Sequence, residues 1–252
     1  MGARSVQIPT PDGVADAFVA HPEGDGPWPA VLFYMDAFGV REVLTDMART
    51  IADDGFFVVL PNVFYRGGAA PLFDTSDLAT PAGRTAVYGQ AVPLIKALTP
   101  ELVVRDAGAY LDFLAAQPEV KPGPIGTNGY CLGGRLAVRT AAAFPDRIAA
   151  VASFHAGGLV TDEPDSPHQQ IADVRTEYYF AHAENDPSMT PADVTALNEV
   201  LDATGVRFKS EIYEGTEHGF TMSDSDVYDP MSLERHWRNL LELFERTLQD
   251  RA

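Results

Sequence analysis

The segment Ile125–Gly134, with the sequence IGTNGYCLGG, decides the fold predicted for this chain. Its first six residues are typical of a short buried strand, and a helical pattern begins directly after Cys131. Gly129 and Gly133 stand two residues before and two residues after the cysteine. This spacing is typical of a nucleophile elbow, a strained turn from strand to helix at which larger flanking side chains would collide with the neighbouring elements. The sequence therefore predicts an α/β fold in which Cys131 is the nucleophile.

Two other interpretations of this turn are weaker. A free cysteine is most often a small buried hydrophobe. The glycine-flanked turn instead favours a reactive thiol, because the helix directs its N-terminal amides at Cys131, where they stabilise both a thiolate and an oxyanion. A dinucleotide-binding turn would need a third glycine at the required spacing and an acidic residue about 20 positions later at a strand end. The sequence has neither, so we expect no dinucleotide cofactor.

Short apolar runs alternate with helical patterns along the whole chain. We predict an N-terminal hairpin of Val6–Pro9 and Asp16–Ala20, strands at Ala30–Tyr34, Phe56–Leu60, Ile125–Tyr130, Ala149–Phe154, Glu177–Ala183 and Phe208–Tyr213, and helices at Val43–Asp54, Arg84–Leu98, Pro100–Ala116, Leu132–Phe144, Ala192–Thr204 and Ser232–Leu248. This alternation predicts one α/β domain over residues 1–252, with a mostly parallel sheet covered by helices on both faces. Ligands of such sheets bind at the carboxyl ends of the strands.

Composition excludes several classes of protein. Of 252 residues, 46% are apolar and 21% are charged, which is an ordinary globular balance. Acidic residues outnumber basic ones 36 to 18, and the net charge of −18 disfavours binding to nucleic acid or to anionic membranes. No apolar run approaches the ~20 residues of a membrane helix, and the N-terminus lacks the pattern of a signal peptide. A single cysteine forms no internal disulfide, so we expect a cytoplasmic protein. We expect it to be a monomer or a homodimer.

A thiol nucleophile needs a base, and the base needs an orienting group. His218 lies in a glycine-bracketed loop after the last predicted strand, and Asp186 follows Glu177–Ala183. Both are therefore expected beside Cys131, in the chain order nucleophile, acid, histidine. Glu184 is the nearest substitute acid. The other histidines are interpreted as structural or solvated, although His155 follows a strand and is a weaker candidate for the pocket: His21, His155, His168, His182 and His236. No pair of histidines, or of histidine and cysteine, has metal-ligand spacing, so no metal is expected.

The motifs together resemble those of the dienelactone hydrolase family of the α/β-hydrolase superfamily. The resemblance rests on Gly129–Gly134, Asp36–Val40 (DAFGV), Asn185-Asp186 and His218–Phe220, which are spread over most of the chain. It implies hydrolysis of a lactone or small carboxylic ester through an acyl-thioester on Cys131, with His218 as base and Asp186 as its partner. It also implies an oxyanion hole formed by the backbone N–H groups of Leu132 and Ala37.

Departures from the family pattern concern substrate recognition. Asp36 stands where the family has a glutamate that holds the resting thiol, so a thiol-gating role passes to a side chain one methylene shorter. Met222 stands where the family has an arginine that binds the substrate carboxylate. Arg84 and Tyr88 match the family's other substrate-binding pair, with Arg66 as an alternative to Arg84. We therefore expect a less acidic or larger substrate than a small dienelactone, bound against an aromatic wall: Phe38, Phe64, Tyr65, Phe73 and Tyr88.

Two other functions remain open at this point. Cys131 alone would suffice for a scavenger of electrophiles or peroxides, although the chain has no second cysteine to resolve an oxidised thiol. A hydrolase scaffold would also serve a sensor that binds a small ester without turnover. The long loop Tyr65–Pro81 is a candidate lid, and the sequence does not decide whether it closes.

Overall fold

The computed structural model describes residues 1–172 and 174–249. Within these ranges eight strands form one sheet in the order β1-β2-β4-β3-β5-β6-β7-β8. The strands are β1 (Gly2–Thr10), β2 (Gly13–His21), β3 (Ala30–Tyr34), β4 (Phe57–Pro61), β5 (Ile125–Tyr130), β6 (Ile148–Phe154), β7 (Glu177–Asn185) and β8 (Arg207–Glu217). The hairpin β1–β2 and the pair β2–β4 are antiparallel, and the remaining pairs are parallel. The predicted fold class is confirmed.

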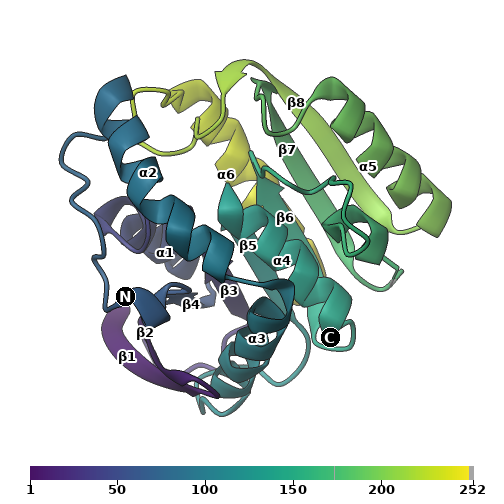
Figure 1. Ribbon diagram of the computed structural model, residues 1–252. Coiled ribbons are helices and arrows are strands. Elements are labelled where there is room, and N and C mark those ends of the chain that lie inside the picture. The colour runs from purple at the N-terminus through teal and green to yellow at the C-terminus, as the bar shows by residue number, and fades with distance from the viewer. Residues whose placement is uncertain (173, 250–252) are drawn as a thin grey trace.

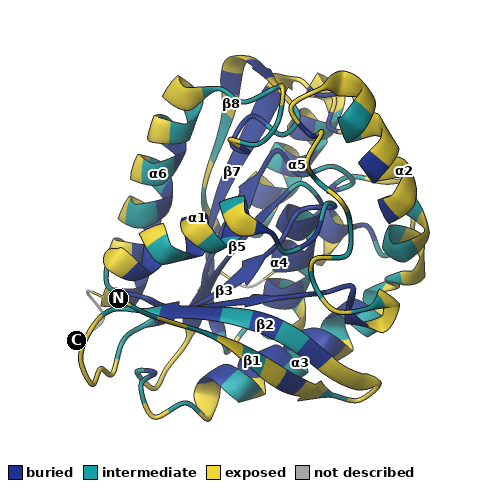
Figure 2. Ribbon diagram, turned by 90° about the vertical axis from the view of Figure 1, so that its left-hand side faces the viewer, coloured by how far each residue is buried: buried dark blue, intermediate teal, exposed yellow. Residues whose placement is uncertain are grey.

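Helices cover both faces of the sheet. They are α1 (Glu42–Asp53), α2 (Pro81–Ala97), α3 (Pro100–Ala115), α4 (Leu132–Ala143), α5 (Pro191–Thr204) and α6 (Pro230–Phe244). In Figure 1, α3 and α4 lie in front of the sheet and α1 and α6 lie behind it. The strands between them are mostly buried, as Figure 2 shows for β3, β5 and β7. This sandwich explains why β3 and β4 are continuous apolar runs rather than alternating ones.

Four helices begin with the same signal, a capping residue followed by proline. Thr80, Thr99, Thr190 and Asp229 each accept a backbone N–H of the first turn, and a proline follows each of them. Proline fits this first position because its missing N–H would have no partner there. The predicted starts at Arg84, Ala192 and Ser232 were therefore too late by one to three residues. At its other end α6 stops at Phe244 and continues as a π-helical turn, Glu245–Gln249.

The buried face of α6 includes a polar residue. Leu240 and Phe244 are buried, whereas Trp237 and Leu241 are only half-buried. His236 takes part in the core instead, and its Nε2 atom lies 2.7 Å from the hydroxyl of Tyr130. Burial lowers the pKa of His236 to about 3, so this side chain stays neutral. His236 is therefore a structural residue that holds α6 against β5.

The long connection between β4 and α2 is mostly irregular, as predicted. Its regular part is one 3-10 turn, Tyr65–Gly67. Phe64, Tyr65 and Leu78 are buried against the body of the protein. No helix in the described residues is both long and apolar enough to cross a membrane.

Candidate active site

Cys131 lies at a strained turn between β5 and α4. Its backbone has φ 54° and ψ −116°, a combination that side chains rarely adopt and that costs about 1–3 kcal/mol. The flanking glycines are required by close packing. A Cβ atom at Gly129 would lie 2.1 Å from the carbonyl oxygen of Gly133, and one at Gly133 would lie 2.5 Å from that of Tyr34. The local chain is thus shaped to hold the thiol at the carboxyl edge of the sheet, and the predicted strained turn from strand to helix is confirmed.

Asp186 and His218 meet at the same edge. The Nδ1 atom of His218 lies 2.6 Å from Oδ2 of Asp186. The other carboxylate oxygen of Asp186 accepts two hydrogen bonds from Ser188, one from the backbone N–H at 2.8 Å and one from the hydroxyl at 2.6 Å. Glu184, the substitute acid, instead accepts the backbone N–H of Gly215 at 2.7 Å. The carboxylate that orients His218 is therefore Asp186.

The charged forms of His218 and Asp186 stabilise each other. Burial disfavours the imidazolium form of His218, but the negative charge of Cys131 and the hydrogen bond with Asp186 outweigh burial and raise the pKa of His218 to about 10. Burial also raises the pKa of Asp186, but His218 and Ser188 oppose it and hold that pKa below its usual value. Since Nδ1 of His218 faces Asp186, Nε2 is the ring nitrogen left for the thiol. The two neighbours, Cys131 and Asp186, thus favour the imidazolium form of His218.

Two backbone N–H groups beside the thiol are free to bind an anion. Leu132 is the first residue of α4, and Ala37 follows the end of β3. Neither of these N–H groups donates a hydrogen bond to another described residue. Both residues line the cavity next to Cys131. Unused donors at a helix start and a strand end have the character of an oxyanion hole.

Asp36 has a partner that the sequence analysis did not foresee. Both of its carboxylate oxygens bind the guanidinium of Arg41, at 2.7 and 2.9 Å, and one also accepts the backbone N–H of Phe38. Arg41 in turn binds Asp224 from the loop before α6. In the described residues Asp36 makes no hydrogen bond to Cys131. Because a buried aspartate at a sheet edge requires a cationic partner, burial of Asp36 would have indicated a residue such as Arg41.

The cleft above Cys131 has two lobes. Ala37, Tyr88, Cys131 and His218 line both of them. The first, which we call the Arg84 lobe, has a volume of about 300 Å³. The second, the Arg135 lobe, has a volume of about 320 Å³. A bound molecule could therefore extend in two directions from the thiol.

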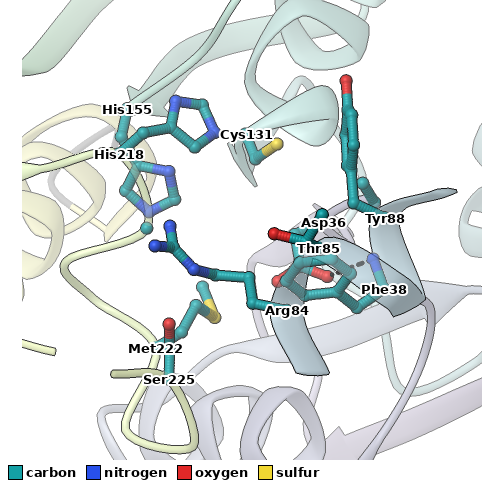
Figure 3. Close-up of a pocket in the computed structure, with 12 residues that line it drawn as sticks. Asp36, Phe38, Arg84, Thr85, Tyr88, Cys131, His155, His218, Met222 and Ser225 are labelled. Atoms are coloured by element: carbon teal, nitrogen blue, oxygen red, sulfur yellow. Dashed lines mark hydrogen bonds between the residues drawn. The ribbon is translucent and has the colours of Figure 1, made fainter. Parts of the chain in front are cut away.

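The Arg84 lobe contains most of the predicted substrate-binding residues. Asp36, Phe38, Arg84 and Tyr88 all line it, and Met222 forms part of its wall (Figure 3). Arg84 and Tyr88 come from α2, and Nε of Arg84 lies 2.9 Å from Oδ1 of Asp226. The expected arginine is thus present, but a carboxylate of the chain itself already binds it.

Several predicted residues lie elsewhere. Arg66, the alternative to Arg84, binds Asp106 and Asp12 outside the cleft. Phe64 and Tyr65 are buried in the core, so the predicted aromatic wall reduces to Phe38 and Tyr88. The residues that line the two lobes include none from the candidate lid, 65–81.

His155, a weak candidate in the sequence, lies inside the site. It is buried, has φ 38°, and lines the Arg84 lobe. Its Nε2 atom lies 2.8 Å from the hydroxyl of Thr221, and its ring meets that of His218 edge-on at 5.3 Å. Burial and the neighbouring His218 lower its pKa well below the usual value. His155 therefore contributes a neutral wall behind His218. Among the described residues no group of three or more His, Cys, Asp or Glu side chains is placed to hold a metal ion.

Comparison with known proteins places this site in a family. The sequence profile of the dienelactone hydrolase family matches residues 15–248. A protein of Methylorubrum extorquens named "Putative carboxymethylenebutenolidase" is 27% identical over 249 residues, which cover 97% of this chain and 81% of that protein. The carboxymethylenebutenolidase of Rhodococcus opacus is 26% identical over 221 residues, covering 86% and 81% of the two chains.

Solved structures agree on the fold. The crystal structure of a Klebsiella pneumoniae protein described as a "Putative Dienelactone Hydrolase" superposes with a TM-score of 0.83 at 21% identity, covering 97% of this chain and 98% of that one. The family match spans almost the whole described chain. The chain is therefore an enzyme of the dienelactone hydrolase family, a hydrolase of the lactone and ester class within the α/β-hydrolase superfamily.

Proposed function

We propose that this protein cleaves a lactone or small carboxylic ester through an acyl-thioester on Cys131, with His218 as general base and acid and Asp186 as its orienting partner. The observation that carries the proposal is the pairing of Cys131, His218 and Asp186 at the turn between β5 and α4. Cys131 occupies a strained turn at a helix start, and the histidine that it charges is held by Asp186 at 2.6 Å. A thiolate at a helix N-terminus next to an imidazolium is a good nucleophile at neutral pH.

The first half of the reaction forms the thioester. The thiolate of Cys131 attacks the carbonyl carbon, a carbon–sulfur bond forms, and the carbonyl electron pair moves to oxygen. The N–H groups of Leu132 and Ala37 stabilise this oxyanion, because neither donates a hydrogen bond to another described residue. When the oxyanion collapses, the carbon–oxygen ester bond breaks. The leaving alkoxide takes the proton of the His218 imidazolium, so an alcohol departs and His218 is neutral.

The second half returns the enzyme to its starting state. Water attacks the thioester carbonyl while Nε2 of neutral His218 accepts a proton from it. The second oxyanion uses the same two N–H groups and collapses with loss of the Cys131 thiolate. The acid product leaves, and the thiolate and imidazolium are restored as a pair. The His218 side chain is 27% exposed, which gives the attacking water access. In a lactone the alcohol and the acid belong to one product molecule.

A panel of 4-nitrophenyl esters and small lactones, dienelactone included, tests the proposal. We expect turnover by the wild type and a loss of at least about 10³-fold in kcat for Cys131→Ala and His218→Ala. Peroxide consumption is measured on the same proteins. An inert wild type that consumes peroxide would favour the scavenger. Ester binding that survives Cys131→Ala without any turnover would favour the sensor, and full activity in either variant would contradict the mechanism.

A further inference from the structure

The arginines around the cleft differ in one respect, namely whether the chain supplies their counter-charge. Arg84 binds Asp226, and Arg41 binds both Asp36 and Asp224. Arg135 lines the second lobe and, in the part of the chain that the structure describes, makes no ion pair and no side-chain hydrogen bond. Acidic residues outnumber basic ones 36 to 18 in this chain, so an arginine without a carboxylate partner needs an explanation.

The position of Arg135 links it to the reacting thiol. It lies in the first turn of α4, four residues after Cys131, so the two residues share one face of the helix start. Its guanidinium packs against the bare backbone of Gly158, since a Cβ atom there would lie 2.9 Å from Nη1. Gly158 thus leaves room for the arginine head in the lobe. The side chain is held in place by packing, and its hydrogen-bond donors have no partner among residues 1–172 and 174–249.

The surroundings of Arg135 favour an external anion. Burial lowers the pKa of Arg135, and the neighbouring Arg139 lowers it further, whereas Cys131 opposes them. Arg139 itself is satisfied by Asp165 and lies outside the lobe. Besides Cys131, the other charged groups that line this lobe are Asp186 and His218, which bind each other. A partly desolvated cation without a partner is unfavourable until an anion pairs with it.

We propose that Arg135 binds a carboxylate carried by the substrate, which makes the substrate an anionic ester or lactone whose charged end lies in the Arg135 lobe. The planar guanidinium matches a carboxylate with two parallel hydrogen bonds. This inference rests on the proposed hydrolysis at Cys131. It changes the expectation of a less acidic substrate, because the arginine absent at Met222 has a counterpart on the opposite side of the thiol.

Paired esters test this role. Mono-4-nitrophenyl glutarate and 4-nitrophenyl pentanoate have acyl chains of equal length and differ by a carboxylate. 5-Acetoxy-2-nitrobenzoate and 4-nitrophenyl acetate differ in the same way on the leaving group. In Arg135→Gln we expect KM for at least one charged ester to rise roughly tenfold to a hundredfold, the scale of a charged hydrogen-bonded pair. Both neutral esters should change less than twofold, and kcat should stay constant.

Arg139→Gln is the matched control, since it removes the same charge from the same helix outside the lobe. It should alter neither KM. Arg135→Lys should recover only part of the affinity, because lysine lacks the planar fork. Equal changes for charged and neutral esters in Arg135→Gln, with a shifted pH profile of kcat, would overturn the inference and assign Arg135 to the thiolate. No change for any ester would overturn it as well.

A second readout does not depend on turnover. The chain has one cysteine, so iodoacetamide alkylation reports on Cys131 alone. Glutarate should slow this alkylation in the wild type and in Arg139→Gln, and it should have no effect in Arg135→Gln. If no ester is hydrolysed but glutarate protects only where Arg135 is present, the hydrolytic proposal fails and the anion site stands. If esters are hydrolysed and glutarate protects none of the proteins, the anion site fails alone.

Discussion

Packing against other residues disfavours the charged form of both His218 at the cleft and His236 under α6, yet their pKa values move in opposite directions. Burial is the largest influence on each. Around His236 the close neighbours are the rings of Tyr130, Phe154 and Trp237, and its pKa falls to about 3. Around His218 the negative charge of Cys131 and the carboxylate of Asp186 reverse the effect, and its pKa rises to about 10. The fold thus determines the charge of a histidine by what it places beside it.

The arginines at the cleft also differ in pKa according to the charged groups beside them. Arg41 and Arg84 have carboxylate partners from the chain, and for Arg41 these partners outweigh burial and raise the pKa. Arg135 has none among the described residues, and burial lowers its pKa. Cations at this cleft are therefore either neutralised by the protein or available to an anion from outside.

The largest effect is expected for Asp186→Asn, which removes one of the two groups that oppose burial at His218. Without the carboxylate only Cys131 still opposes burial, so the pKa of His218 falls, and the orientation of the ring is lost. We expect kcat for a 4-nitrophenyl ester to fall by about 10³- to 10⁴-fold. Glu184→Gln is the matched control, since Glu184 binds the backbone of Gly215, and it should lose less than about fivefold. Retention of more than a tenth of the activity in Asp186→Asn would contradict the assigned role.

The next largest effect concerns the free energy of unfolding and the buried ion pair of Arg41 and Asp36. Arg41→Met leaves Asp36 buried without its partner, and Asp36 is 3% exposed. We expect the free energy of unfolding to fall by about 3–5 kcal/mol in urea titrations. Arg49→Met removes a pair of the same type from exposed positions on α1 and should cost less than about 1 kcal/mol. Equal losses in the two variants would show that burial does not govern these pairs.

A smaller effect appears in the dependence of stability on pH. Below about pH 6.5 the unfolded chain protonates His236, whereas the folded chain does not until about pH 3. The fold therefore loses stability as pH decreases through this window. His236→Gln should reduce the loss between pH 6.5 and pH 5 by about 2 kcal/mol, measured by urea unfolding at both values. An unchanged pH dependence would mean that His236 is protonated in the folded protein.

The smallest effect is expected for Ser188→Ala, which tests positioning rather than charge. Ser188 donates its hydroxyl to Asp186 at 2.6 Å, and its backbone N–H bond to the same oxygen remains in the variant. Loss of one hydrogen bond of about 1 kcal/mol predicts a decrease in kcat of about fivefold. The apparent pKa in the kcat profile should move as well, because Asp186 is less well held. A lower stability with an unchanged profile would make Ser188 merely structural.

The sequence predicted the elements of the fold well because their signals are local. The run Ala30–Tyr34 and the segment Ile125–Tyr130 coincide with β3 and β5 residue for residue. Errors arose at helix starts, where proline acts as a breaker in the sequence and as a first residue in the structure. His236 was the other difficulty. The local sequence does not reveal that His236 is buried, because its hydrogen-bond partner, Tyr130, is distant in the chain.

At the site, residues tied to the backbone turn or to a strand end were predictable, and residues selected by tertiary partners were not. Cys131 follows from its flanking glycines, and the structure places Asp186 and His218 in contact. Arg41 and Ser188 could not be found from spacing, because their roles exist only through the carboxylates that they meet in space. The opposite holds for Arg135, which has no ion-pair partner among the described residues. That lack can be recognised only when all its neighbours in space are known.

The most direct test of the account is mass spectrometry of the enzyme quenched in acid during turnover of a 4-nitrophenyl ester. We expect one acyl group on the peptide that contains Cys131, removed by hydroxylamine at neutral pH as a thioester is. The Cys131→Ala variant should carry no acyl group and should release no nitrophenolate above background. Turnover at the wild-type rate by Cys131→Ala would contradict the central claim that the thiol at the elbow carries the reaction.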